Sequence, residues 1–95
     1  MDNNAAKTFK SIIKRVANHE KYSLEEFYKT YGKSMRSAAY TVTRSYDLCE
    51  EVIDDILIYV WDNTHKLLDI KNPNAWLYTA CYKRAIDKIK YKKPT

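Results

Sequence analysis

Apolar residues recur at intervals of three and four along almost the whole chain, and Gly32 is its single glycine. This spacing gathers apolar side chains on one face of a helix, whereas an exposed strand would show strict alternation. It predicts four helical segments, over about 5–17, 23–42 and 48–62 and from near residue 73 onward. We therefore expect an all-α fold, a compact bundle of three main helices plus a shorter N-terminal helix.

Polar residues at the predicted helix starts suggest how each helix is capped. Ser23 and Glu26 have the spacing of a capping box, in which each side chain accepts from the other residue's backbone amide. Asp47 and Glu50 form a second such pair, and Asn72 is a good N-cap for the last helix. These signals predict where the three main helices begin.

The helix predicted over 48–62 has an apolar side and an acidic side. At 100° per residue, its buried side would hold Leu48, Val52, Ile53, Ile56, Leu57, Tyr59 and Val60. The opposite side would present Glu51, Asp54, Asp55 and Ile58. An isoleucine among solvated acids is either incidental or part of a contact surface. We favour a docking face for a basic partner.

The last predicted helix separates in the same way into a core side and a basic side. Its apolar stripe would hold Leu77, Tyr78, Cys81, Tyr82, Ala85, Ile86 and Ile89, with the tyrosines mostly packed. The other side would hold Trp76, Thr79, Lys83, Asp87 and Lys90, flanked by Arg84 and Lys88 and extended by Lys92 and Lys93. Basic residues at helical spacing can neutralise phosphates, and an indole can stack on an unpaired base. A solvated basic face with Trp76 under a neighbouring helix is the alternative.

Formal charge is distributed in blocks, behind a net value of +5. Residues 45–70 carry seven acids and a single base, Lys66, whereas residues 71–95 carry seven bases and a single acid, Asp87. Such blocks indicate two surfaces with different partners. Helix faces that segregate by sign without function remain the alternative.

Several classes of protein and site lack support in the sequence. There is no nucleophile beside a base, no glycine-rich phosphate loop and no metal-spaced ligand set, so neither an enzyme nor a cofactor or metal site is indicated. Cys49 and Cys81 lack CxxC spacing and fit apolar stripes, which predicts two core thiols. No apolar run is long enough to cross a membrane and the N-terminus lacks a secretion signal, so we expect a cytoplasmic protein without membrane contact.

Two consecutive segments, DLCEEVIDDILIYVWDN and NAWLYTACYKRAIDKIKYKK, resemble region two of the extracytoplasmic-function (ECF) sigma factors of bacterial RNA polymerase. The family pattern A-E-D-x-x-Q-E-x-F-x-x-x-W is matched in register by Cys49, Glu50, Glu51, Asp54, Asp55, Leu57 and Trp61. Its second pattern, W-L-x-x-I-A-x-N-x-x-x-D-x-x-R, is matched by Trp76, Leu77, Ala80, Cys81, Lys83, Asp87 and Lys90. The resemblance extends over about 24–93 and predicts a sigma region-two-like domain.

The resemblance implies two partners. In the family the acidic helix docks on the clamp helices of the largest subunit of the polymerase core, which implies a polymerase-binding set of Glu51, Asp54, Asp55 and Ile58. The last helix and the loop before it open the minus-ten promoter element and hold a base of the non-template strand. The implied DNA-binding set is Trp76, Thr79, Lys83, Arg84, Lys88 and Lys90, with His65 and Lys66 from the loop. An anti-sigma factor is a further candidate partner.

The chain also departs from the family pattern. Asp54 stands where Gln is usual, Lys83 where Asn is usual and Lys90 where Arg is usual, which bears on clamp binding and on base choice. We expect an N-terminal helical segment over 1–22, the sigma region-two-like domain over 23–93 and the start of a linker at 94–95. The chain would then be a fragment of a longer protein that also reads the minus-thirty-five element, which is the simpler explanation, or a standalone domain that cannot recognise a whole promoter by itself. A helical duplex-DNA-binding regulator and a protein-interaction bundle without DNA affinity are the alternative functions.

Overall fold

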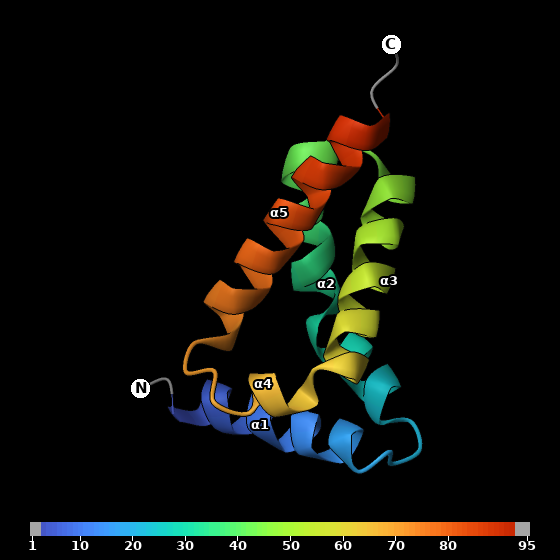
Figure 1. The fold of residues 1–95 in the computed structure, drawn as a ribbon. Helices are drawn as coiled ribbons and strands as arrows, with labels where there is room; N and C mark the ends of the chain where they lie inside the picture. Colours follow the sequence, from blue (N-terminus) through green and yellow to red (C-terminus); the bar gives the residue numbers. More distant parts are fainter. Residues whose placement is uncertain (1–2, 93–95) are drawn as a thin grey trace.

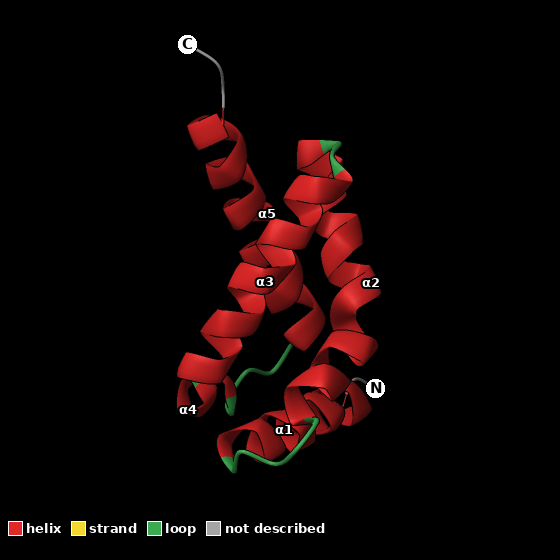
Figure 2. Ribbon diagram, turned by 90° about the vertical axis from the view of Figure 1, so that its right-hand side faces the viewer, coloured by secondary structure: helices red, strands yellow, loops and turns green. Residues whose placement is uncertain are grey.

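The computed structural model describes residues 3–92, and these residues form five helices joined by short connections (Figure 1; Figure 2). The helices are α1 (Asn3–Ala17), α2 (Ser23–Thr43), α3 (Tyr46–Asp62), α4 (Thr64–Leu67) and α5 (Pro73–Lys92). Over the described range the all-α prediction is confirmed, and helix boundaries fall within a few residues of those expected. The predicted extension of the basic face by Lys93 and the linker residues 94–95 lie outside the described range.

The three long helices form the body of the molecule. α2, α3 and α5 pack together side by side, while α1 crosses below them together with the short α4 (Figure 1). α4 lies within the stretch expected to be a loop, and its buried Leu67 anchors it to the core. No helix in the described range is long and apolar enough to cross a membrane.

One hydrophobic core joins all five helices. Its buried members are Phe9, Ile12, Ile13, Val16, Phe27, Tyr31, Met35, Ala38, Ala39, Cys49, Val52, Ile53, Ile56, Val60, Leu67, Leu77, Cys81 and Ala85. The two cysteines are buried free thiols, as expected, and burial raises the pKa of the Cys81 thiol to about 11. Because α1 contributes four of these side chains, it is an integral part of the fold.

Three tyrosines that we expected to pack are exposed instead. Tyr59 is 40% exposed, Tyr78 52% and Tyr82 41%, so the apolar stripes of α3 and α5 are narrower than the sequence suggests. Each of the three stands at the edge of its stripe, where the ring can rest against the protein and the hydroxyl can stay in water. Tyr78 and Tyr82 stack on each other with ring centroids 5.9 Å apart.

The predicted caps of α2 and α3 are wrong, because their side chains have other partners. α2 follows Tyr22 in the left-handed conformation (φ 66°) without a side-chain cap, and the Ser23 hydroxyl donates to the Glu20 carbonyl at 2.7 Å. The Glu26 carboxylate accepts from Arg15 of α1. The Ser23 backbone amide, which would donate to Glu26 in a capping box, instead donates to the Glu20 carbonyl at 3.1 Å.

α3 is capped two positions earlier than the Asp47 pair would place it. The N-cap is Ser45, whose hydroxyl accepts from the Leu48 amide at 3.2 Å. α5, in contrast, begins as expected, with the Asn72 side chain accepting from the Ala75 amide at 3.2 Å. Of the three predicted caps, only the one at Asn72 is confirmed, because no distant residue competes for its side chain.

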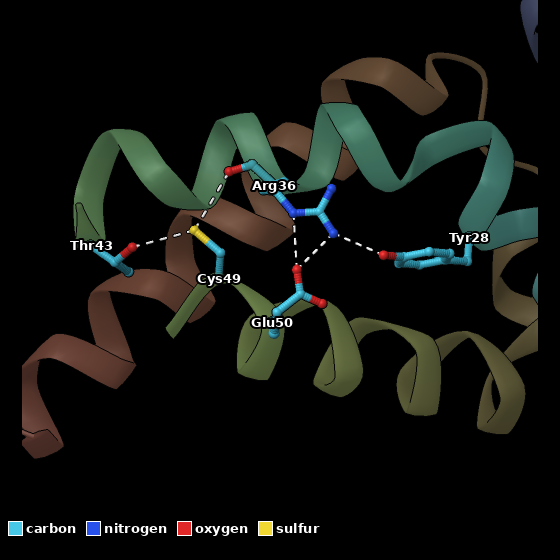
Figure 3. Close-up of polar contacts among 5 residues, drawn as sticks. All are labelled: Tyr28, Arg36, Thr43, Cys49 and Glu50. Atoms are coloured by element: carbon cyan, nitrogen blue, oxygen red, sulfur yellow. Dashed lines mark hydrogen bonds and ion pairs between the residues drawn. The ribbon is translucent and has the colours of Figure 1, made fainter. Parts of the chain in front are cut away.

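Polar contacts between α2 and α3 fix the position of α3 (Figure 3). The Arg36 guanidinium donates to the Glu50 carboxylate at 2.6 Å and to the Tyr28 hydroxyl at 2.8 Å. Next to Glu50 in the sequence, the buried Cys49 thiol lies 3.7 Å from the Arg36 carbonyl and 3.5 Å from the Thr43 hydroxyl. These contacts hold Glu50 on the α2 side of α3, so that the next acidic residues of the helix lie towards α5 and solvent.

Candidate functional site

A groove of about 690 Å³ runs between α3 and α5. Its lining residues are Asp55, Ile56, Ile58, Tyr59, Asp62 and Asn63 on the α3 side and Trp76, Thr79, Ala80, Lys83, Arg84 and Asp87 on α5. The two helices are antiparallel, since Glu51 and Asp55 of α3 face Lys88 and Arg84 of α5, in that order. The groove thus brings residues predicted for polymerase binding and for DNA binding to one site.

At one end of the groove, acids and bases neutralise each other. Asp55 accepts from Arg84 Nε at 2.9 Å and from Lys88 Nζ at 3.0 Å, and Lys88 Nζ also lies 3.5 Å from a Glu51 oxygen. We call these four side chains the paired half of the site. For them, the expected separation of an acidic and a basic surface does not hold, because the two helices pack closely enough for opposite charges to meet.

The electrostatics of the paired half favour the charged forms. Burial alone would raise the pKa of Asp55, but hydrogen bonds from Lys88 and Arg84 outweigh it and hold this pKa below its ordinary value. The hydrogen bond to Asp55 raises the pKa of Lys88. The side chains of Asp55 and Lys88 are only 26% and 22% exposed, so solvent screens this pair less than an ordinary surface pair.

At the other end of the groove, charged and aromatic side chains are exposed without salt bridges. Ile58 is 61% exposed, and Asp54 and Lys83 are exposed and form no salt bridge with any described side chain. Thr79 is exposed beside Lys83, and Tyr59 faces the same groove. We call the groove residues Ile58, Tyr59, Trp76, Thr79 and Lys83, together with Asp54, which is exposed on α3 outside the groove lining, the open half of the site.

Trp76 is neither fully accessible nor fully covered by a neighbouring helix, the two alternatives that the sequence left open. Its ring is partly buried against the core, with centroids 6.2 Å from Phe9 and 6.0 Å from Tyr59, yet it also lines the groove. The indole therefore packs against the core and also contributes to the surface of the groove. This arrangement holds the ring in place before any ligand arrives.

The remaining predicted site residues lie outside the groove lining. Lys90 is exposed further along α5, and His65 and Lys66 are exposed on α4, at the Trp76 end of the fold. Lys92 lies in α5 as well. The fold thus brings most of the predicted DNA-binding residues to α5 and leaves His65 and Lys66 on a neighbouring element.

Sequence reasoning missed several residues that shape the site. Tyr59, Asp62 and Asn63 line the groove, although Tyr59 was assigned to the core and the other two to no site. Asn63 Nδ2 donates to the Tyr59 carbonyl at 2.9 Å and ends α3 there. An aromatic residue at the edge of an apolar stripe is the one sequence signal that could have pointed to Tyr59.

Comparison with known proteins identifies the family. Residues 27–95 match the Sigma-70 region 2 model, a range that includes most of α2 and all of α3, α4 and α5. The chain belongs to the sigma-70 region 2 family. The family resemblance inferred from the acidic and basic helices is therefore confirmed.

Curated relatives agree with this assignment of the region 2 domain. Over 86 residues, this chain is 31% identical to the ECF RNA polymerase sigma factor SigK of Mycobacterium bovis (strain BCG / Pasteur 1173P2). It has the same identity to the ECF RNA polymerase sigma factor SigK of Mycobacterium tuberculosis (strain ATCC 25618 / H37Rv). The alignment covers 84% of this chain and 43% of each relative, so the chain spans less than half their length. No solved structure matches this chain.

Proposed function

We propose that this region 2 domain acts in transcription initiation, as a non-enzymatic part of an ECF sigma factor. In this proposal α3 docks on the clamp helices of the polymerase core, and α5 binds the opened minus-ten element of a promoter. The observation that carries the proposal is the open half of the groove, where both surfaces are accessible on neighbouring helices of a region 2 fold.

The polymerase contact would centre on Asp54 and Ile58. Both are exposed on α3, and they combine a carboxylate with an apolar side chain, which suits a basic partner helix that also offers a hydrophobic contact. Glu51 and Asp55 lie on the same helix, but they already face Lys88. We propose that they strengthen docking through long-range attraction, while Asp54 and Ile58 make the direct contact.

The DNA contact would centre on Trp76, Thr79 and Lys83. An unpaired base that enters the groove can stack on the accessible part of the indole, and the ammonium of Lys83 can neutralise a phosphate beside it. Lys90, and also Arg84 and Lys88 beyond their contacts with Asp55, would extend the positive potential along α5. His65 and Lys66 would approach the strand from α4.

Energetics make the polymerase partner necessary for promoter opening. Unstacking DNA costs about 1.4 kcal/mol per base-pair step, and stacking one base on an aromatic side chain returns about 1–3 kcal/mol. One indole and a few phosphate contacts can therefore capture a segment that is already open. They do not supply enough free energy to melt several base pairs of intact duplex.

Capture of the polymerase's largest subunit tests the protein-binding half of the proposal. Asp54→Lys should reduce recovery of a fragment bearing the clamp helices by about tenfold or more, because it places like charges at the contact. Glu25→Lys, a charge change of the same size and sign at an exposed position on α2, is the matched control and should leave recovery unchanged. Equal recovery of the Asp54→Lys variant and the unaltered chain would contradict docking through this face.

Binding to single-stranded oligonucleotides of promoter non-template sequence tests the DNA-binding half. Affinity should fall as salt rises, and Lys83→Gln should make that fall less steep by about 0.7 in log–log slope, the change expected for one lost phosphate contact. Tighter binding to intact duplex than to single strand would favour a duplex-binding regulator instead. Absence of nucleic-acid binding at low salt would favour a protein-interaction bundle.

A further inference from the structure

α1 carries a row of basic residues that the site described above does not use. Four basic residues and no acidic residue occur within Asn3–Ala17. Lys7, Lys10 and Lys14 are spaced by three and four, so they share one face of the helix, and all three are exposed. We call these three residues the α1 lysine row. It lies outside residues 27–95, the range that matches the family model.

The α1 lysine row is unfavourable for the stability of the isolated fold. Like charges three and four residues apart repel each other, and a lysine in the first turns of a helix also opposes the helix dipole. Arg15 is relieved of this repulsion by the Glu26 carboxylate, whereas none of the three lysines forms a salt bridge with a described side chain. A helix whose exposed face serves only solubility would intersperse acids among the bases. The sequence thus keeps a repulsive arrangement that an anionic partner would relieve.

The position of α1 indicates which anionic partner fits. Phe9, on the buried face of α1, contacts the Trp76 ring with centroids 6.2 Å apart, so α1 lies at the end of the fold where we place the DNA strand. The lysine row, together with Ser11 and Arg15, lines a shallow hollow of about 410 Å³. A membrane surface fits less well, because the apolar face that would insert into lipid is already buried in the core.

We infer that the α1 lysine row binds the sugar-phosphate backbone of promoter DNA next to the segment held at Trp76. This inference rests on the proposed function and extends the DNA-binding surface to an element that the family match does not include. Lys7 and Lys14 are separated by about 10 Å along the helix axis at about 1.5 Å per residue. Phosphates of one duplex strand recur about every 3.4 Å, so the row can reach about three of them.

The salt dependence of DNA binding tests the inference and identifies the form of DNA involved. The triple variant Lys7→Gln, Lys10→Gln, Lys14→Gln keeps good helix formers on α1 and removes three charges. If the row contacts single-stranded DNA, the log–log slope of affinity against salt should become shallower by about 2, and if it contacts duplex, by nearly 3. Mixed-sequence single-stranded and duplex oligonucleotides should be titrated in parallel, with circular dichroism to verify that the helices are intact.

A matched control separates a local contact from a general loss of charge. The variant Lys21→Gln, Lys29→Gln, Lys33→Gln removes three exposed lysines from other parts of the surface and should change the slope much less. Equal salt slopes for the two triple variants would overturn the inference. Binding of the unaltered chain to anionic vesicles, combined with equal DNA affinity of the two triple variants, would also overturn it. An unchanged salt slope in the α1 variant, together with a shallower slope in Lys83→Gln, would overturn this inference but leave the proposed DNA contact on α5 intact. The reverse result would support the α1 row and contradict the proposed contact on α5.

Discussion

The paired and open halves of the site on α3 and α5 contain similar charged residues but differ in what those residues contact. In the paired half, Asp55 holds Arg84 and Lys88 at 2.9 and 3.0 Å. In the open half, Asp54 and Lys83 are exposed and have no salt-bridge partner among the described side chains. Neighbouring positions on the same helices therefore carry charges that stabilise the packing of α3 against α5 and charges that are accessible to partners.

This difference shows that formal charge is a poor guide to accessible charge. A block of seven acids precedes a block of seven bases in the sequence. Some residues of each block form salt bridges with the other where α3 and α5 meet. A salt bridge with little solvent exposure couples two elements of the fold, whereas an exposed charge mainly steers an approaching partner. The open half is thus the better guide to function, and the paired half explains how α5 is held against α3.

The largest effect on both fold and binding is expected at Trp76. Trp76→Ala removes a half-buried ring from Phe9 and Tyr59, which should lower the free energy of unfolding by about 2 kcal/mol, less than for a fully buried tryptophan. It should also weaken single-strand DNA binding by about tenfold through the lost stacking. Urea unfolding and fluorescence titration measure the two effects.

Trp76→Phe sharpens the same test, because it retains much of the packing and a smaller stacking surface. It should be closer to the unaltered chain than the alanine variant in both measurements. Full DNA affinity in Trp76→Ala would show that the indole serves the core alone, and the open half would then lose its aromatic contact.

A smaller effect should distinguish the two halves directly. A double-mutant cycle with Asp55→Ala and Lys88→Ala should give a coupling energy of about 0.5–1 kcal/mol, which decreases with added salt. The same cycle with Asp54→Ala and Lys83→Ala should give a coupling near zero, because neither residue has a salt-bridge partner. Equal coupling in the two cycles would remove the distinction between the halves.

The smallest expected effect is the pH dependence of stability. Because the pKa of Asp55 is lower in the folded chain than in the unfolded chain, its contribution is complete above the unfolded pKa and disappears as pH falls through the folded one. Stability should therefore decrease below about pH 4, the ordinary range for an aspartic acid. Asp55→Asn should make this decrease less steep, and Asp54→Asn should not. Thermal unfolding between neutral and acidic pH measures the difference.

Local patterns in the sequence predict the helices and most of the core, but not the contacts between distant residues. Apolar periodicity is sufficient for the helices, and Asn72 is recognised as a cap because its partner, Ala75, is three residues away. The caps at Glu26 and Glu50 fail because arginines 11 and 14 residues earlier bind these carboxylates instead.

The candidate site shows the same limit over a longer separation. Arg84 and Asp55 are 29 residues apart, and only the packing of α5 against α3 brings them together. The sequence does identify which residues belong to the acidic and basic faces, because each face lies on one helix. It does not indicate how much of each face the neighbouring helix neutralises, since this depends on the register between α3 and α5.

Because α1 is part of the core, the segment that must be present for folding is longer than the segment that matches the family. The family model begins at residue 27, but the side chains that cover Phe27 and Tyr31 include Phe9 of α1. A shortened protein that began at the family boundary would expose these rings, together with Leu67 of α4, to water. Such a protein should aggregate, and any comparison of DNA or polymerase affinity between long and short versions would then report loss of the core instead of loss of a binding surface.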